Sequence, residues 1–178
     1  QRLNAQYVTK NSAPRQVYEA KLTGDFKKIH ISNLFKGSGS YHSLKKDHFD
    51  ALLVDEAHRL NERSGMFQNI GENQIKEIIN ASKFSCFFLD EDQKVTFKDI
   101  GEVEEVEKWA KYNKADLVKL KLSSQFRCDG SDGYLAWLDN VLQIRETAND
   151  SFEDYDFKVF NDPNELREAI EEKNKINN

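Results

Sequence analysis

Two adjacent carboxylates and a histidine follow directly after a short apolar run. Residues 51–54 read Ala-Leu-Leu-Val, and Asp55, Glu56 and His58 come just after them. An unbroken apolar run of this length is typical of a strand buried on both faces of a parallel sheet. Because ligands of such sheets bind outside the carboxyl ends of the strands, the pattern places Asp55 and Glu56 where a phosphate-bound metal would sit. The alternative is a solvated acidic pair that ends a strand.

A second acidic strand end occurs at Asp90. Residues 87–89 read Phe-Phe-Leu, and Gln93 follows Asp90 three positions later. A glutamine amide is neutral and both donates and accepts hydrogen bonds, so it can contact a phosphate or an attacking water without competing for its proton. The alternative is a solvated acidic turn.

An arginine follows an aromatic residue after a third apolar segment. Residues 117–122 lead through two serines into Gln125-Phe126-Arg127. The planar guanidinium of Arg127 could spread fixed positive charge over phosphate oxygens as negative charge shifts during a reaction. The alternative is a surface arginine in a loop, and Phe126 is expected in the core.

The first apolar segment also ends in polar residues. Thr9 and Asn11 could donate hydrogen bonds to the phosphates of a nucleic acid, and Lys10 and Arg15 could neutralise them. The alternative is a helix N-terminus capped by Asn11 or Ser12, and the two roles can coexist.

In chain order these segments resemble motifs Ia, II, III and IV of superfamily-one helicases, motif II being the Walker B motif of P-loop NTPases. Leu89 departs from the glycine that this family usually has before the motif III aspartate. Three phrases resemble, more narrowly, a bacterial P-loop family with Schlafen-type DNA/RNA helicase domains. They are Tyr-Val-Thr-Lys-Asn-Ser-Ala-Pro-Arg (7–15), Phe-Asp-Ala-Leu-Leu-Val-Asp-Glu-Ala-His-Arg-Leu (49–60), and Gln-Phe-Arg-Cys (125–128) with Gly-Ser-Asp-Gly-Tyr-Leu-Ala-Trp-Leu (130–138). The resemblance covers about residues 5–145.

The resemblance implies an α/β fold, a three-layer RecA-like core with a mostly parallel sheet, and a role for Mg²⁺ and ATP. Asp55 would hold Mg²⁺, largely through water, and Glu56 would orient or deprotonate the attacking water. The implied catalytic residues are Glu56, Gln93 and Arg127; the implied nucleotide contacts are Asp55, His58, Gln93 and Arg127. The implied nucleic-acid contacts, with a single strand, are Thr9, Lys10, Asn11 and Arg15.

The chain has no phosphate-binding loop of the form Gly-x-x-x-x-Gly-Lys-Ser/Thr. Gly37-Ser-Gly39-Ser lacks the Lys-Ser/Thr ending and is interpreted as a loop. In the family this element precedes motif Ia directly, so the sequence is interpreted as an incomplete core, a fragment of a longer protein. The fragment alone is expected to bind no cofactor and to be inactive, whereas the intact parent protein would bind Mg²⁺ and ATP.

Three functions remain open from the sequence. The first is a part of a helicase-like ATPase that acts on nucleic acid. The second is a non-catalytic module that binds nucleic acid or protein. The third is a metal-dependent nuclease with Asp55, Glu56 and Asp90 as ligands, which would leave Gln93 and Arg127 without a role.

Alternating strands and helices must position these residues. Strands are predicted at residues 5–9, 28–34, 51–54, 84–89, 117–122 and 157–160, and helices at 15–22, 72–82, 102–112 and 133–142, with a last helix starting at Pro163. Residues 1–146 are predicted to form the RecA-like core. Residues 147–178 are predicted to add an acidic linker, a short strand and a C-terminal helix to the same domain.

Composition limits the class of protein. The 178 residues carry a net charge of −5, which argues against a generally basic nucleic-acid binder but not against a local basic patch. No apolar stretch approaches the roughly 20 residues needed to span a bilayer, so no membrane partner is expected. With two cysteines and no leader sequence, the chain is predicted to be cytoplasmic.

Overall fold

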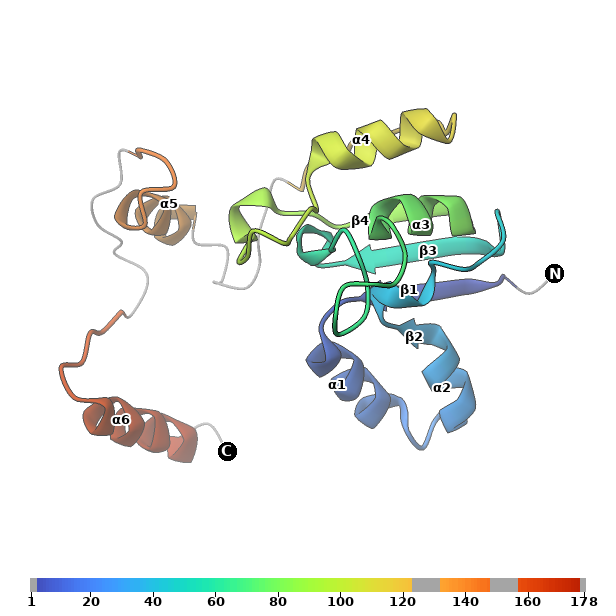
Figure 1. Ribbon diagram of the computed structural model, residues 1–178. Helices are drawn as coiled ribbons and strands as arrows, with labels where there is room; N and C mark the ends of the chain where they lie inside the picture. The colour runs from blue at the N-terminus through green and yellow to red at the C-terminus, as the bar shows by residue number, and fades with distance from the viewer. Residues whose placement is uncertain (1–2, 123–131, 148–156, 177–178) are drawn as a thin grey trace. The chain divides into compact units, whose positions relative to one another are not determined.

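The computed structural model describes residues 3–122, 132–147 and 157–176, which contain a parallel four-stranded sheet (Figure 1). The sheet order is β2-β1-β3-β4, and all three strand pairings are parallel. The strands are β1 (Ala5–Thr9), β2 (Phe35–Lys36), β3 (Phe49–Asp55) and β4 (Ser82–Phe87). The α/β class and the parallel sheet of a RecA-like core are therefore confirmed.

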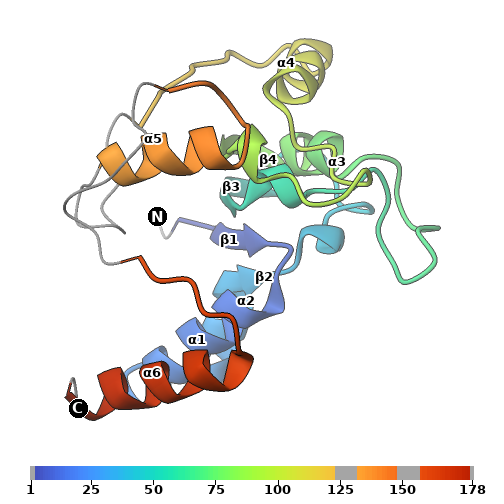
Figure 2. The same ribbon diagram turned by 90° about the vertical axis from the view of Figure 1, so that its left-hand side faces the viewer.

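Four helices accompany the sheet in residues 3–119, which form one compact unit. Helix α3 lies beside β3 and β4 and carries α4 on its outer side, and α1 and α2 lie beside β1 and β2 (Figures 1 and 2). The helices are α1 (Ser12–Leu22), α2 (Lys28–Leu34), α3 (Gln74–Ala81) and α4 (Val103–Tyr112), and short 3₁₀ turns cover Ser38–Ser40, Ala57–Arg59 and Glu91–Gln93.

Strand β3 lies inside the sheet, between β1 and β4, and its side chains differ in burial on the two faces. Leu52 and Val54 are fully buried against Ile75 and Ile78 of α3. On the opposite face Leu53 is 39% exposed. The apolar run therefore forms a central strand, as predicted, but only one of its faces is fully covered.

Helix α3 begins at a side-chain cap. The Asn73 carboxamide oxygen accepts hydrogen bonds from the backbone N–H groups of Ile75 and Lys76, at 3.0 and 3.1 Å. Its amide nitrogen donates to Glu105 Oε1 of α4 at 2.9 Å. One asparagine thus satisfies two free N–H groups of α3 and ties α3 to α4.

The prediction of a strand at residues 28–34 is wrong, because this segment forms helix α2. The alternation of Ile29 and Ile31 suggested a strand, but Ile31 is buried and Ile29 is exposed. Phe35 enters the sheet instead, where it pairs with Tyr7 and stacks on Tyr18 of α1 at a ring-centroid distance of 5.1 Å.

The strand predicted at residues 117–122 is also wrong. Val118, Leu120 and Leu122 alternate with lysines, but their side chains are exposed and the segment has no strand partner within the described part of the chain. A period of two requires a neighbouring strand to become a sheet, and sequence periodicity does not reveal whether one is present.

The described segments within residues 120–178 belong to a second compact unit. It contains α5 (Asp132–Val141) and α6 (Pro163–Ile176). Trp137 of α5 contacts Phe157 edge to face, with ring centroids 4.8 Å apart. The two helices occur where they were predicted, and the Asp162 carboxylate accepts from the Asn164 N–H at 2.8 Å at the start of α6. The short strand predicted at residues 157–160 is wrong, since this stretch is irregular.

Within the described residues, no helix is both long and apolar enough to cross a membrane.

Candidate functional site

The two carboxylates lie where the chain leaves the sheet. Asp55 is the last residue of β3 and is paired in register with Thr9 of β1. Glu56 then adopts the left-handed conformation (φ 52°, ψ 43°), which is unfavourable for a residue with a side chain. The Ala57 N–H donates to the Phe88 carbonyl at 2.8 Å, so the turn is held against the end of β4. This strained but well-bonded turn gives Asp55 and Glu56 separate surroundings.

Tyr7 of β1 donates its hydroxyl hydrogen to Asp55 Oδ2. Its ring packs edge-on against Tyr18 and Phe35, each at a centroid distance of 5.6 Å. Burial, together with the hydrogen bond to Asp55, raises the pKa of the Tyr7 hydroxyl well above its ordinary value of about 10. Tyr7 is therefore a neutral donor at neutral pH, and it fixes one oxygen of the Asp55 carboxylate.

His58 is buried and bridges the two acidic strand ends. Its Nε2 lies 3.2 Å from Glu56 Oε2, and its Nδ1 accepts a long hydrogen bond from the Asp90 N–H at 3.4 Å. Because Nδ1 accepts, the proton of a neutral ring lies on Nε2 and points to Glu56; this tautomer is assigned from the hydrogen-bond pattern. His58 thus connects Glu56 to the turn that follows β4.

Gln93 lies on that turn and is oriented by Asp90. The Gln93 amide donates to Asp90 Oδ2 at 2.7 Å, and the Asp92 N–H donates to Asp90 Oδ1 at 3.2 Å. The structure therefore brings Asp55, Glu56, His58 and Gln93 to the same edge of the sheet, at the carboxyl ends of β3 and β4. Both carboxylate oxygens of Asp90 accept hydrogen bonds from within this turn.

A buried ion-pair network lies beside the carboxylates. The Asp99 side chain is fully buried, with Lys10 Nζ 3.1 Å from Oδ1 and Arg59 Nε 3.1 Å from Oδ2. Lys10 also donates to Asn61 Oδ1 at 2.9 Å. The backbone N–H groups of Val95 and Thr96 donate to Asp99 Oδ2. Asp99 therefore joins the end of β1, the turn after Glu56 and the loop after Gln93; we call these residues the Asp99 network.

Gly101 allows the last of these segments to approach the turn after β3. A Cβ atom at Gly101 would lie 1.9 Å from the Ala57 carbonyl oxygen and 2.4 Å from the His58 Cα, so no other residue fits without moving the backbone. Next to it, the Ile100 N–H donates to the Leu60 carbonyl at 2.8 Å.

A family model described as Schlafen group 3, DNA/RNA helicase domain matches residues 1–178. The chain belongs to this family. The Schlafen-type helicase resemblance of the sequence is thereby confirmed; its bacterial P-loop part stays a prediction. Membership also supports an interaction with nucleic acid.

The chain is also similar to a yeast protein. The chain is 26% identical over 180 residues to the "Uncharacterized protein YPL245W" of Saccharomyces cerevisiae, an alignment that covers 87% of this chain and 39% of the yeast protein. The chain thus spans well under half of that relative. No solved structure shows significant similarity to the 178-residue chain.

The predicted nucleic-acid residues of this Schlafen group 3 domain have mixed surroundings. Thr9 is fully buried, and its hydroxyl has no hydrogen-bond partner among the described residues. Lys10 is engaged by Asp99 and Asn61, and Arg15 packs over Gly37, where an added Cβ would lie 2.9 Å from its guanidinium. Asn11 begins α1 without a side-chain cap. These four residues do not form a common open surface, and their role in binding stays a prediction.

Other predicted roles also stay open. Arg127, and Phe126 with its expected place in the core, lie outside the described residues. Both ring nitrogens of His58 have protein partners, so a nucleotide contact by His58 remains a prediction. Tyr7, Arg59 and Asp99 were missed by sequence reasoning. Tyr7 belongs to the segment 7–15 that resembles the family, but nothing in the sequence spacing linked Tyr7 to Asp55.

Proposed function

We propose that this chain carries the catalytic carboxylates of a nucleic-acid-dependent ATPase and that its parent protein supplies the phosphate-binding loop. The observation that supports this most strongly is the connection from Glu56 through buried His58 to the turn that bears Gln93. Glu56 is the candidate base for the attacking water, Gln93 the candidate γ-phosphate contact, and Arg127 the candidate group that stabilises negative charge in the transition state.

The donor set fits Mg²⁺ held through water. Tyr7 occupies Asp55 Oδ2, whereas no hydrogen bond to Oδ1 occurs among the described residues, so that oxygen is open to a hydrated cation. No cluster of three or more His, Cys, Asp or Glu side chains suited to a metal occurs in the described part of the chain. A single carboxylate suits Mg²⁺ that is also held by nucleotide phosphates. When bound, the ion would neutralise phosphate charge.

The phosphates themselves need donors that this sequence does not contain, because it has no Gly-x-x-x-x-Gly-Lys-Ser/Thr. We therefore expect Mg²⁺-dependent ATP hydrolysis by the parent protein, stimulated by single-stranded nucleic acid, and no turnover by the 178-residue chain. The measurement is phosphate release with and without an oligonucleotide, with EDTA as the metal-free control. A parent protein that contains the loop yet hydrolyses no ATP, or hydrolyses it equally well in EDTA, would contradict the proposal.

Tyr7→Phe gives a second test, directed at the metal. Without the hydroxyl, Asp55 loses the donor that orients it, and partners of metal ligands typically contribute 10–100-fold to metal affinity. In the parent protein we expect about a tenfold rise in the Mg²⁺ concentration that gives half-maximal hydrolysis. Tyr41→Phe is the matched control, since the Tyr41 hydroxyl donates to Gln6 at 3.0 Å instead. Equal Mg²⁺ dependence of the two variants would show that Tyr7 does not position Asp55 for a metal.

The second candidate is a module that binds nucleic acid without hydrolysis. The missing phosphate-binding loop favours it, and it predicts oligonucleotide binding that is indifferent to ATP. No observation favours a nuclease, because Asp90 accepts hydrogen bonds from Gln93 and from the Asp92 N–H.

A further inference from the structure

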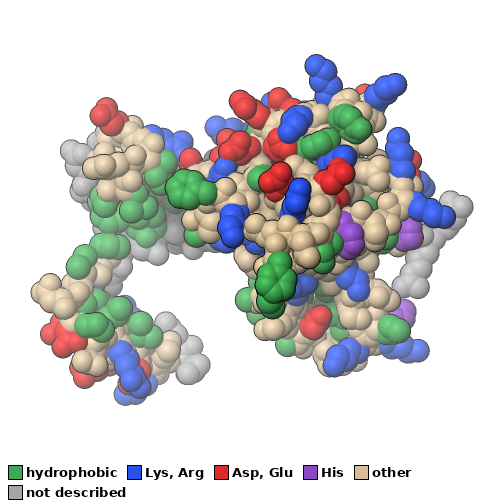
Figure 3. Space-filling model, viewed as in Figure 1, with side chains coloured by type: hydrophobic (Ala, Val, Ile, Leu, Met, Phe, Trp, Pro, Cys, Tyr) green, Lys and Arg blue, Asp and Glu red, His purple; other side chains and the backbone are tan. Residues whose placement is uncertain are grey.

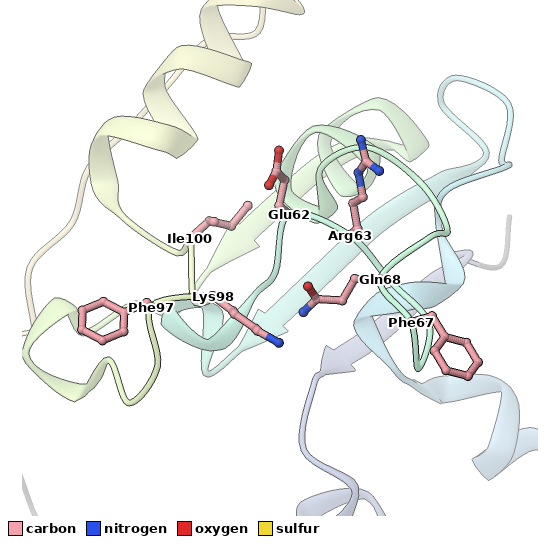
Figure 4. A pocket seen from close by; sticks show the side chains of 7 residues that line it. All are labelled: Glu62, Arg63, Phe67, Gln68, Phe97, Lys98 and Ile100. Atoms are coloured by element: carbon pink, nitrogen blue, oxygen red, sulfur yellow. The ribbon is translucent and has the colours of Figure 1, made fainter.

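A cavity of about 430 Å³ lies between two loops, at residues 61–71 and 94–101 (Figure 4). This volume is within the range of small-molecule sites. Phe67 and Phe97 stand at its opposite ends, and Arg63, Gln68 and Lys98 lie between them. The proposed ATPase chemistry uses none of these residues.

Both loops are held in shape by their own hydrogen bonds. Ser64 and Ile70 exchange two backbone hydrogen bonds, of 2.8 and 3.1 Å, and close a small hairpin around Phe67. The Asp99 carboxylate accepts from two N–H groups of the other loop, and the Asp99 N–H donates to the Thr96 carbonyl at 3.0 Å. The side chain of Phe67 is 83% exposed and that of Phe97 is completely exposed. Two well-bonded loops therefore present aromatic rings to solvent at the ends of one cavity.

The two cations of the cavity form no close ion pair with the residues described, although Arg63 adds to the effect of the Lys76 hydrogen bond in lowering the pKa of the Glu72 carboxyl. Arg63 and Lys98 form no ion pair within 4.0 Å in the described part of the chain, whereas Lys10 and Arg59 close by are both paired with Asp99. Glu62 also lines the cavity and reduces its net positive charge. The face in Figure 3 mixes acidic and basic side chains and shows no single broad basic field. Attraction of an anion would therefore be local to this cavity.

Exposed aromatic rings beside cations suit a ligand that combines flat rings with negative charge. Single-stranded nucleic acid has this chemistry: its bases stack on aromatic side chains and its phosphates pair with Lys and Arg. A duplex hides the faces of its bases, and an acidic peptide offers charge without planar bases.

We propose that the cavity between residues 61–71 and 94–101 binds a single strand of nucleic acid, with Phe67 and Phe97 stacking on bases and Arg63 and Lys98 contacting phosphates. The proposal rests on the proposed function only for the choice of nucleic acid as partner; binding here requires no ATP. It does not use Thr9, which is buried, or Lys10, whose ammonium group is engaged by Asn61 and Asp99. Since Lys98 precedes Asp99, the bound strand would contact a loop that is joined to the turn after Glu56 through Arg59.

The test uses the 178-residue chain without nucleotide, and fluorescence anisotropy of labelled 20-residue oligo-dT and oligo-U. Stacking on one aromatic side chain is worth roughly 5- to 100-fold in affinity. We therefore expect Phe97→Ala and Phe67→Ala each to weaken binding about tenfold. Phe26→Ala is the matched control, because Phe26 is also an exposed phenylalanine, 59% accessible, in the turn between α1 and α2. Circular dichroism checks that each variant is folded.

A salt titration separates phosphate contacts from stacking. For a single strand, each neutralised phosphate contributes about −0.7 to the slope of log affinity against log salt concentration. Lys98→Ala should reduce the steepness of this slope by about 0.7, whereas Phe97→Ala and the surface control Lys28→Ala should leave it unchanged.

Several outcomes would overturn the proposal: no binding by the wild-type chain, equal loss for Phe97→Ala and Phe26→Ala, equal affinity for a duplex of the same sequence, or poly-glutamate binding with the same dependence on Phe97. Because ATP is absent from the assay, these results are independent of whether the parent protein hydrolyses ATP.

Discussion

Glu56→Gln should lower the ATP turnover of the parent protein by at least about 100-fold and leave its affinity for ATP unchanged. General bases typically contribute 10²- to 10⁴-fold to a rate, and an amide cannot accept the proton of the attacking water. Binding should persist, because we assign Glu56 to the water and not to the phosphates. The measurements are steady-state phosphate release and titration with a fluorescent ATP analogue.

The structure favours this substitution because it should leave the site intact. Glutamine has the shape of glutamate and keeps an oxygen that can accept from His58 Nε2, which lies 3.2 Å from Glu56 Oε2. The left-handed backbone at residue 56 is no less favourable for glutamine than for glutamate. A loss of turnover can therefore be attributed to the missing base and not to a rearranged turn.

Glu104→Gln is the control for this experiment, since it makes the same chemical change on the exposed surface of α4. It should retain full turnover. If Glu56→Gln retains turnover as well, Glu56 is not the base. If both turnover and ATP binding are lost, the carboxylate holds the nucleotide or its metal instead of activating water.

The strand ends of the site could be predicted from the sequence because local pattern determines them. The run at residues 51–54 indicates a buried strand, and the next residues of such a strand must lie at the carboxyl edge of the sheet. Asp55, Glu56 and Gln93 therefore lie at the predicted edge. The bridge through His58 was not predictable, because it depends on the angle at which the chain leaves β3 and on the pairing of Ala57 with Phe88.

Contacts between residues far apart in the chain were the features that the sequence predicted least well. Lys10 and Asp99 are 89 positions apart, and no spacing rule connects them. A lysine after a strand suggests a phosphate contact when its partner is unknown, and only the fold reveals a buried carboxylate 3.1 Å away. For the same reason the periodicity at residues 28–34 and 117–122 predicted strands wrongly, since the partners of those residues decide their structure.

Removing the Asp99 carboxylate should destabilise the unit formed by residues 3–119 by about 3 kcal/mol. Breaking a buried ion pair by deleting one partner typically costs 3–5 kcal/mol, because the other charge loses its compensation. In Asp99→Ala, Lys10 and Arg59 lose their shared carboxylate, and two backbone N–H groups lose their acceptor. Asp99→Asn keeps an oxygen for those N–H groups, so we expect a smaller loss.

Tryptophan fluorescence can follow this unit alone. The chain has two tryptophans, and Trp137 belongs to the second unit, so in a Trp137→Phe background Trp109 of α4 reports on the first. The measurement is the urea midpoint of unfolding. Asp50→Ala is the control, because both partners of Asp50, Lys83 at 2.7 Å and the Asn4 N–H at 3.0 Å, are exposed to solvent. Its midpoint should stay close to that of the Trp137→Phe protein.

The same carboxylate should give the stability a defined dependence on pH. Burial alone would raise the pKa of Asp99, but hydrogen bonds from Lys10 and from the Thr96 and Val95 N–H groups outweigh burial and hold it below its ordinary value of about 3.9. The stabilisation is then fully present above about pH 4 and is lost as the pH falls through the folded-state pKa. Wild-type protein should lose stability more steeply than Asp99→Asn below about pH 4. Parallel pH profiles for the two proteins would show that the Asp99 charge does not hold together the end of β1, the turn after Glu56 and the loop after Gln93.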